Sequence, residues 1–281
     1  MPEHLVVVFI VLLWIFVVDK SYVKFVNFQK NAGLWHHTLN VLVILKYAYH
    51  NNKIPIIPMF EFGESMGLGS ERIFDTNLSQ YYDYTKLKID GKPYEVILDD
   101  KFNNENVEVI DLSKSDGENV KFGYGGWFPA IKELQVDKNI DVELPVQDYL
   151  IQDSLKVIDD LGKYVCVHVR RGDHLSQIKS MDKSTQSENI LKILDELIDD
   201  SYNVYIMTNE EDLTLFNKIT QQYNTYFWTD FDVLKEWYNK DNYLLFCIEL
   251  LIMKSANKKI SSIERNYPLG IGKCDRWLDE S

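Results

Sequence analysis

The stretch Tyr164-Val-Cys-Val-His-Val-Arg-Arg-Gly-Asp173 decides the fold class of this 281-residue chain. Its first six residues, 164–169, are almost wholly apolar and rich in valine, which is typical of a strand buried on both faces of a parallel sheet. Two arginines, a glycine and an aspartate follow, so the strand ends in a polar turn. Ligands of open parallel sheets bind at the carboxyl ends of strands, and the sequence therefore predicts a binding loop directly after residue 169.

Helices and strands alternate on both sides of this strand. A helix is expected over 148–161, and an amphipathic helix capped by Ser187 is expected over 187–200. The rest of this half predicts, in order, strand 203–207, helix 212–223, strand 226–228, helix 242–254 and strand 259–262. Such alternation builds an α/β domain around a parallel sheet.

The first half of the chain carries a similar pattern. A strand over 22–28, a helix over 35–50 and a strand over 53–58 make a βαβ unit, and prolines restrict the last strand to an edge or a strand end. The expected organisation is therefore a hydrophobic N-terminal segment over 1–20, a first α/β domain over 21–145 and a second α/β domain over 146–281.

Residues 5–18 form an unbroken run of fourteen apolar side chains. The run is shorter than the ~20 residues that a membrane-spanning helix needs. It fits an uncleaved membrane anchor, the apolar core of a signal peptide or a buried segment, and these alternatives stay open. An anchor or a signal would place the protein in the secretory pathway, at Golgi or ER membranes, whereas a buried segment leaves the cytoplasm open.

The formal net charge is −13, which argues against nucleic acid as a partner because phosphate backbones are bound by basic surfaces. A phosphate-bearing ligand must then be held by a few well-placed cations. Arg170 and Arg171 stand out for this reason, since the planar guanidinium group binds phosphate oxygens in pairs and keeps its charge.

The three cysteines, Cys166, Cys247 and Cys274, show no metal-binding spacing, so no metal site is expected. Cys166 and Cys247 lie in apolar runs and are expected to be buried free thiols, whereas Cys274 could form a disulfide in an oxidising compartment. The glycine patterns of classical dinucleotide-binding and P-loop folds are absent from the sequence.

Three segments could carry chemistry. The first is His168-Val-Arg-Arg-Gly-Asp173, for which an ordinary strand end with a surface Arg–Asp pair is the alternative. The second is 207–212, where Asn209 and Glu210 could contact a base or a ribose, or where acidic residues could simply cap a helix. The third is 32–38, where a glycine loop leads into a helix whose N-terminus could bind phosphate.

Together these segments resemble the fucosyltransferases that use GDP-fucose, in particular the α1,6-fucosyltransferases of N-glycan cores and the bacterial nodulation fucosyltransferases. The similar stretches are Gly33-Leu-Trp-His-His-Thr-Leu39, His168-Val-Arg-Arg-Gly-Asp173 and Val204-Tyr-Ile-Met-Thr-Asn-Glu210. A strand ending at Ser262 resembles a closing element of that family. The resemblance covers about two thirds of the chain in scattered blocks.

The resemblance implies a GT-B-type fold, with two Rossmann-like domains whose parallel sheets face a cleft. It implies an inverting transfer that needs no metal or cofactor, with GDP-fucose as donor and a glycan or glycoconjugate as acceptor. Arg170 would pair with the β-phosphate and His168 would contact guanine. The other residues implied at the GDP-sugar site are Arg171, Asn209, Glu210, Gly33, His36, His37 and Ser262, with Asn209 standing where the family more often has aspartate.

The base that activates the acceptor does not carry over, because Ile178 falls near its expected place. Inverting transfer needs a base within hydrogen-bond reach of the acceptor hydroxyl, and Asp173, His174 and Asp182 are the candidates. The sequence after Ser262 also departs from the family. Two alternatives therefore stay open: a transferase for another GDP-sugar, and a catalytically degenerate relative that binds a glycan or a protein partner.

Overall fold

The computed structural model describes residues 21–26, 34–62, 74–99, 102, 107–111, 139–171, 175, 179–262 and 274–278. The chain divides into two compact units, which interleave in sequence because residues 30–39 and 60–87 group with residues 143–281. The boundary expected between residues 145 and 146 stays a prediction. Each unit is described by itself.

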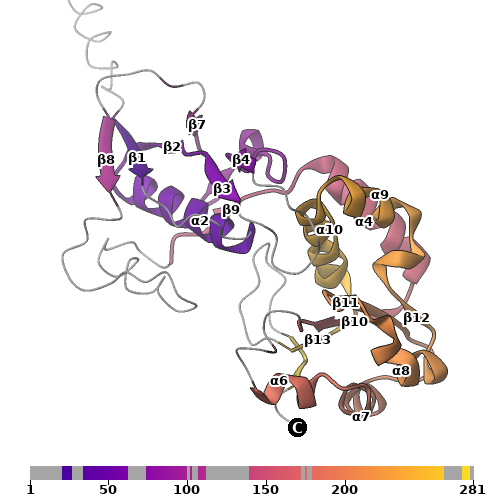
Figure 1. Ribbon diagram of the computed structural model, residues 1–281. Coiled ribbons are helices and arrows are strands. Elements are labelled where there is room, and N and C mark those ends of the chain that lie inside the picture. Colours follow the sequence, from indigo (N-terminus) through magenta and orange to yellow (C-terminus); the bar gives the residue numbers. More distant parts are fainter. Residues whose placement is uncertain are drawn as a thin grey trace, which may run out of the picture. The chain divides into compact units, whose positions relative to one another are not determined.

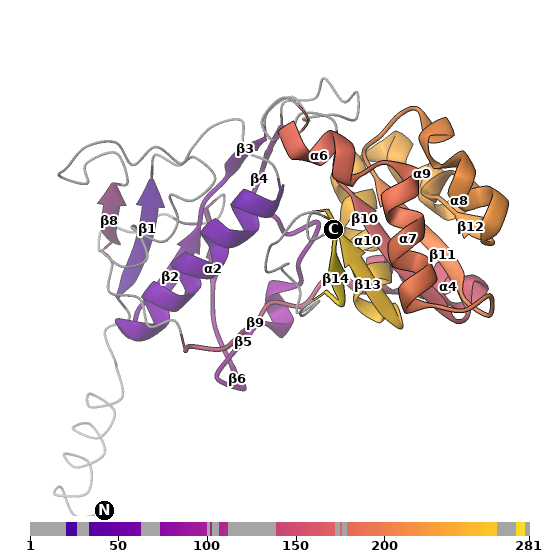
Figure 2. The same ribbon diagram turned by 90° about the horizontal axis from the view of Figure 1, so that it is seen from below.

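The first unit contains a parallel sheet in the order β7-β2-β1-β8. Figure 2 shows β8, β1 and β2 side by side, with α2 along one face. The ring of Phe25 on β1 meets that of Tyr47 on α2 edge-on at 5.4 Å. The bounds are β1 Tyr22–Val26, α2 Leu34–His50, β2 Ile54–Ile57, β7 Ile97–Leu98 and β8 Val107–Asp111.

The strand β2 lies inside the sheet, although its prolines favoured an edge or a strand end. Pro55 is the second residue of β2 and faces Val23 of β1. The pairing of β2 with β7 involves only Ile56 and Ile57. The missing N–H of proline therefore removes no hydrogen bond on the β7 side, and the strand end tolerates it.

Shorter elements occur between residues 60 and 143, a range that is divided between the two units. β5 Lys88–Ile89, β6 Lys92–Pro93 and β9 Val142–Glu143 form a sheet in the order β6-β5-β9. β3 Phe60–Phe62 and β4 Phe74–Thr76 pair antiparallel, and a short 3₁₀ helix, η1, spans Tyr84–Lys86.

The second unit is built on a parallel sheet in the order β12-β11-β10-β13-β14, with β10 in the centre. The strand bounds are β10 Tyr164–Val169, β11 Asn203–Thr208, β12 Thr225–Tyr226, β13 Lys258–Ser261 and β14 Arg276–Trp277. All six residues of β10 are buried, as the apolar sequence predicts for a central strand. The predicted α/β class with parallel sheets is confirmed.

Helices cover both faces of this sheet (Figure 1). Val165, Val167 and Val169 pack with residues of α7 and α8 on one face. On the other face, the hydroxyls of Tyr164 and Tyr205 donate to the Ile252 carbonyl and the Glu249 carboxylate of α10. The bounds are α4 Asp148–Leu161, α6 Lys179–Ser184, α7 Ser187–Leu197, η4 Leu213–Phe216, α8 Asn217–Gln222, η5 Trp228–Asp230, α9 Asp232–Lys240 and α10 Asn242–Ser255.

Two helix ends show how local sequence sets the boundaries. α4 ends at Leu161 because Gly162 adopts a φ of +61°, a backbone region that favours glycine. The prediction that Ser187 caps α7 was wrong. The N-cap is Gln186, and the hydroxyl of Ser187 instead donates to the carbonyl of Leu215.

Cys166 and Cys247 are buried free thiols, as predicted, and Cys274 is also buried and free. The apolar run 5–18 lies outside the described residues. Within the described parts of the chain, no helix combines the length and the apolar character that crossing a membrane requires.

Candidate functional site

The candidate site lies at the carboxyl ends of three neighbouring strands, β10, β11 and β13. Val169 faces Thr208 across the β10–β11 pairing, so residues 170–171 and 209–210 leave the sheet together. The Arg170 N–H donates to Ser262 Oγ at 2.8 Å, and the Arg171 N–H donates to Asn209 Oδ1 at 2.8 Å. These bonds fix the backbone of both arginines against the adjacent strand ends.

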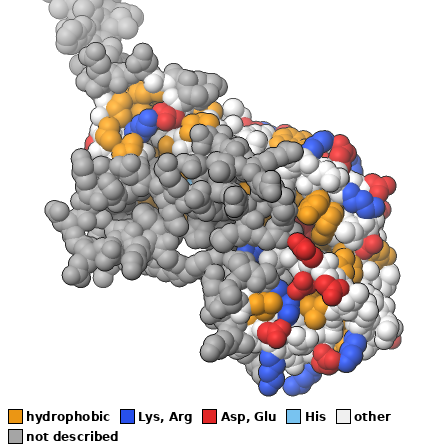
Figure 3. Space-filling model, viewed as in Figure 1, with side chains coloured by type: hydrophobic (Ala, Val, Ile, Leu, Met, Phe, Trp, Pro, Cys, Tyr) orange, Lys and Arg blue, Asp and Glu red, His pale blue; other side chains and the backbone are white. Residues whose placement is uncertain are grey.

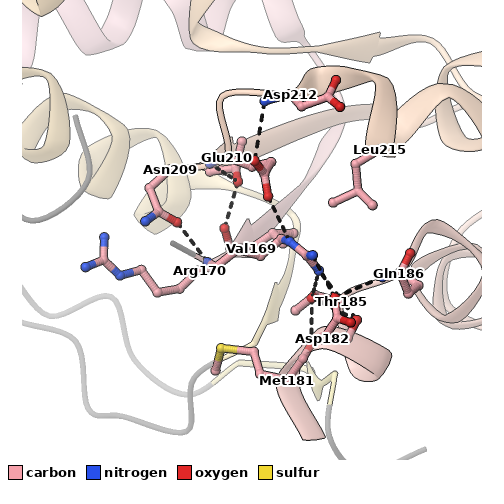
Figure 4. A network of polar contacts seen from close by, with 12 residues as sticks. Val169, Arg170, Met181, Asp182, Thr185, Gln186, Asn209, Glu210, Asp212 and Leu215 are labelled. Carbon is pink, nitrogen blue, oxygen red and sulfur yellow. Dashed lines mark hydrogen bonds and ion pairs between the residues drawn. The ribbon is translucent and has the colours of Figure 1, made fainter. Parts of the chain in front are cut away.

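The Arg171 guanidinium is held inside the protein by a network of polar contacts (Figure 4). Its Nε donates to Glu210 Oε2 at 2.9 Å, and one terminal nitrogen donates to Asp182 Oδ1 at 2.8 Å. The other terminal nitrogen donates to the Thr185 hydroxyl and to the Asp182 carbonyl. The side chain is only 8% exposed, so these partners offset the free-energy cost of removing its charge from water.

This network ties α6 to the strand ends. Asp182 and Thr185 lie in and just after α6, whereas Glu210 follows β11. Asp182 was a candidate base, and its Oδ1 also accepts from Gln186 Nε2 at 3.1 Å. Its carboxylate is therefore engaged by two donors of the protein.

Arg170 differs from its neighbour. It is half-buried, and its guanidinium extends away from the Arg171 network, to the side on which the Asn209 amide lies (Figure 4). Burial raises the pKa of Tyr243 in α10 to about 12, nearby Asp241 adds to the rise, and the charge of Arg170 opposes it. The Arg170 charge therefore acts near the start of α10.

The Asn209 side chain is buried, with 8% of the residue exposed. Oδ1 accepts the Arg171 N–H, while Nδ2 is buried with no hydrogen-bond partner among the residues that the structure describes. The loop around it is ordered by Thr208, whose hydroxyl donates to the Val169 carbonyl at 2.8 Å and accepts the Glu210 N–H at 3.0 Å.

His168 is the fifth residue of β10 and is 6% exposed. Its carbonyl accepts the Ser262 N–H at 2.9 Å, which ties β10 to the end of β13. The structure thus brings together six of the predicted site residues: His168, Arg170, Arg171, Asn209, Glu210 and Ser262.

Of the remaining predicted residues, which lie within residues 33–37 and in the loop after β10, the structure describes only the His37 side chain. His37 is fully buried in α2, with its ring 4.7 Å from that of Phe60. Gly33, Asp173, His174 and the His36 side chain lie outside what the structure describes.

Thr185 and Thr208 were missed by sequence reasoning. Thr208 ends a strand and precedes an Asn-Glu pair, and threonine commonly bonds nearby backbone groups at such positions, so this signal was available. Thr185 follows a short polar helix and carries no such signal. Among the described residues, no group of three or more potential metal ligands exists.

Comparison of the sequence with protein-family models and with curated proteins finds no match. Solved structures do resemble it. POFUT1 in complex with GDP-fucose matches 86% of this chain and 90% of its own at 10% identity, with a TM-score of 0.50. The chain has the GT-B fold of the fucosyltransferases.

Two further solved structures show similar coverage of both chains. The NodZ α-1,6-fucosyltransferase soaked with GDP-fucose matches 88% of this chain and 89% of its own, at 10% identity and a TM-score of 0.48. The fucosyltransferase NodZ from Bradyrhizobium matches 90% and 91%, at 11% identity and a TM-score of 0.45. Identities this low show nothing of the activity, so function has to be argued from the site.

Proposed function

We propose that the protein is an inverting, metal-independent glycosyltransferase that moves fucose from GDP-fucose to a hydroxyl group of a glycan or glycoconjugate. The observation that carries this proposal is Arg170. It is the first residue after the central strand, its backbone is fixed by Ser262, and its guanidinium extends away from the ion pairs of Arg171. Ligands of parallel sheets bind at this edge.

In this proposal Arg170 stabilises the departing GDP. Negative charge grows on the β-phosphate as the glycosidic bond breaks, so a cation fixed beside it lowers the barrier more than it strengthens ground-state binding. Acidic and basic side chains are interspersed on the face of the second unit in Figure 3. With a net charge of −13 the protein as a whole repels anions, so affinity has to come from local cations such as Arg170.

In this proposal Arg171 acts indirectly, through its contacts within the protein. Because all three of its guanidinium nitrogens donate to protein acceptors, it positions the loop and Arg170 rather than offering its charge to phosphate. His168, Asn209 and Ser262 lie at the same strand ends and complete the donor site. Only the sequence supports the remaining assignments. These are Gly33, His36 and His37 as donor-binding residues, and Asp173 and His174 as candidate bases.

The second candidate is a GDP-sugar-binding or glycan-binding protein without turnover. The engagement of Asp182 with Arg171 and Gln186 favours it, since one of three candidate bases is thereby held as an ion-paired carboxylate. A transferase for a different GDP-sugar would use the same phosphate contacts.

Thermal unfolding of a chain starting at Ser21, with GDP, GDP-fucose, GDP-mannose, UDP-glucose and ADP in parallel, tests the donor. GDP and GDP-fucose should raise the midpoint, because a ligand that binds only the folded state stabilises it. Arg170→Ala should abolish the shift. Lys192→Ala, which removes one exposed cation from α7, should keep it.

A folded protein that no nucleotide stabilises would contradict the proposal. GDP binding without GDP release in the presence of glycan acceptors would favour the second candidate. We further propose that residues 5–18 hold the enzyme at Golgi or ER membranes, which fractionation of cells expressing chains that begin at Met1 and at Ser21 would test.

A further inference from the structure

The amide nitrogen of Asn209 is a donor that the described protein leaves unused. The side chain is 8% exposed, and Nδ2 is buried without a partner among the residues that the structure describes. Burying an unbonded polar group costs free energy, and native proteins rarely keep one without cause. A bound ligand that supplied an acceptor would remove this cost.

The direction of the amide is fixed. A flip would place Nδ2 against the Arg171 N–H, which now donates to Oδ1 at 2.8 Å. The backbone on either side is held as well, since the Thr208 hydroxyl bonds both the Val169 carbonyl and the Glu210 N–H. Nδ2 is therefore a preorganised donor.

Strand geometry puts this donor on the same side as Arg170. Successive residues of an extended chain point to opposite faces. Tyr205 on β11 points to α10, where it bonds Glu249, and Asn209 continues the same series. Figure 4 shows the Asn209 amide nitrogen and the Arg170 guanidinium on one side, away from Glu210 and Asp182.

We propose that Asn209 Nδ2 donates a hydrogen bond to a phosphate oxygen of the bound nucleotide-sugar diphosphate, beside Arg170. This inference rests on the proposed function. With Oδ1 occupied by Arg171, the remaining end of Asn209 is a pure donor, and phosphate oxygens are pure acceptors. A purine edge presents donors beside its acceptors and matches this end less well. A charge-assisted bond to phosphate is also the stronger one.

A consequence separates this role from base recognition. A contact to phosphate strengthens binding of every nucleoside diphosphate by a similar factor, so Asn209 sets affinity for the diphosphate and leaves the choice of base to other residues.

The test is titration calorimetry of GDP, ADP and guanosine against the full chain and its variants. Asn209→Asp keeps an oxygen for the Arg171 N–H and replaces the donor with a carboxylate oxygen that repels phosphate. We expect GDP affinity to fall about 10- to 100-fold, the equivalent of losing one hydrogen bond to a charged group. ADP affinity should fall by the same factor wherever it is measurable, and guanosine affinity should not change.

Thr208→Val is the matched control, because it breaks two hydrogen bonds of the same loop and keeps the Asn209 side chain. It should lower GDP affinity by a smaller factor than Asn209→Asp does. Asn209→Ala serves if the aspartate variant does not fold, with the same ligand pattern and a smaller loss.

If Asn209→Asp weakened guanosine binding as much as GDP binding, the contact would be to the base. If Thr208→Val weakened GDP binding as much as Asn209→Asp does, Asn209 would act only by maintaining the loop. Either result overturns the inference. Unchanged GDP affinity in Asn209→Asp also overturns it and leaves the proposed function standing. If the wild-type protein bound none of these ligands, both this inference and the proposed function would fail.

Discussion

Glu249 offers a quantitative test of the packing between α10 and the second sheet. Its side chain is buried on α10, and its Oε1 accepts a 2.9 Å hydrogen bond from the Tyr205 hydroxyl on β11. Burial raises the pKa of Glu249 from the ordinary 4.5 to about 8, and the hydrogen bond from Tyr205 acts in the opposite, weaker direction. The folded protein therefore holds a proton at pH 7 that the unfolded chain has released.

This difference in pKa sets the sign and size of a pH dependence. Between pH 4.5 and 8 the folded state binds more protons than the unfolded state, so rising pH favours unfolding. Each pH unit in this interval lowers the free energy of unfolding by about 1.4 kcal/mol. From about pH 5.5 to about pH 7.5 the wild type should lose about 3 kcal/mol through this one group.

Glu249→Gln keeps an oxygen for the Tyr205 hydroxyl and cannot ionise. Urea unfolding followed by tryptophan fluorescence, at pH values between about 5 and 8, would measure both proteins, and the other carboxyl groups cancel in the difference. The wild type should weaken relative to Glu249→Gln as pH rises. Tyr205→Phe, which removes the bond that lowers this pKa, should extend the decline to higher pH. A difference between wild type and Glu249→Gln that stays constant with pH would refute the reasoning.

Two further predictions concern the strand-end site. Glu210→Gln should lower the free energy of unfolding by about 2 kcal/mol or more, because it removes the charge that pairs with the buried Arg171 guanidinium. Asp182→Asn should lower it by less than about 1 kcal/mol, because the Asp182 carboxylate is 63% exposed. Thermal unfolding would measure both variants, and a larger loss in Asp182→Asn than in Glu210→Gln would contradict this account of the network. Ser262→Ala removes the acceptor of the Arg170 N–H, so it should lower the free energy of unfolding by about 1 kcal/mol and weaken GDP binding. An unchanged affinity in a GDP titration would mean that this hydrogen bond does not position Arg170.

The pattern of hydrophobic residues allowed the central elements to be predicted from the sequence. The predicted bounds of α4 and β10 match the structure residue for residue, because α4 has a clear amphipathic period and the short, valine-rich run of β10 is typical of a buried strand. α6 and α9 were not predicted. Both are short and polar, and α6 is held by bonds from Arg171, a partner outside its own sequence.

The position of the candidate site could be predicted from the sequence, but the roles of its individual residues could not. Strand ends identify where a ligand binds in a parallel sheet, and the pairing of β10 with β11 and β13 brings His168, Asn209 and Ser262 to that edge. Which polar groups remain for a ligand depends on tertiary partners. Glu210 could have contacted a base by its sequence position, yet its carboxylate bonds Arg171, and nothing local to residues 207–212 predicts that pairing.

The two adjacent arginines differ because strand geometry continues past the end of β10. Val165, Val167 and Val169 face α7 and α8, and Arg171 extends that series toward Asp182 and Glu210. Arg170 belongs to the alternate series, which faces α10, and its charge acts on Tyr243 there. On β11 the same alternation sends Glu210 to the first side and Asn209 to the second. The sheet thus separates a stabilising ion-pair side from a side that carries the Arg170 cation and an amide nitrogen of Asn209 that has no partner among the described residues, which are the two features that the proposed diphosphate contact uses.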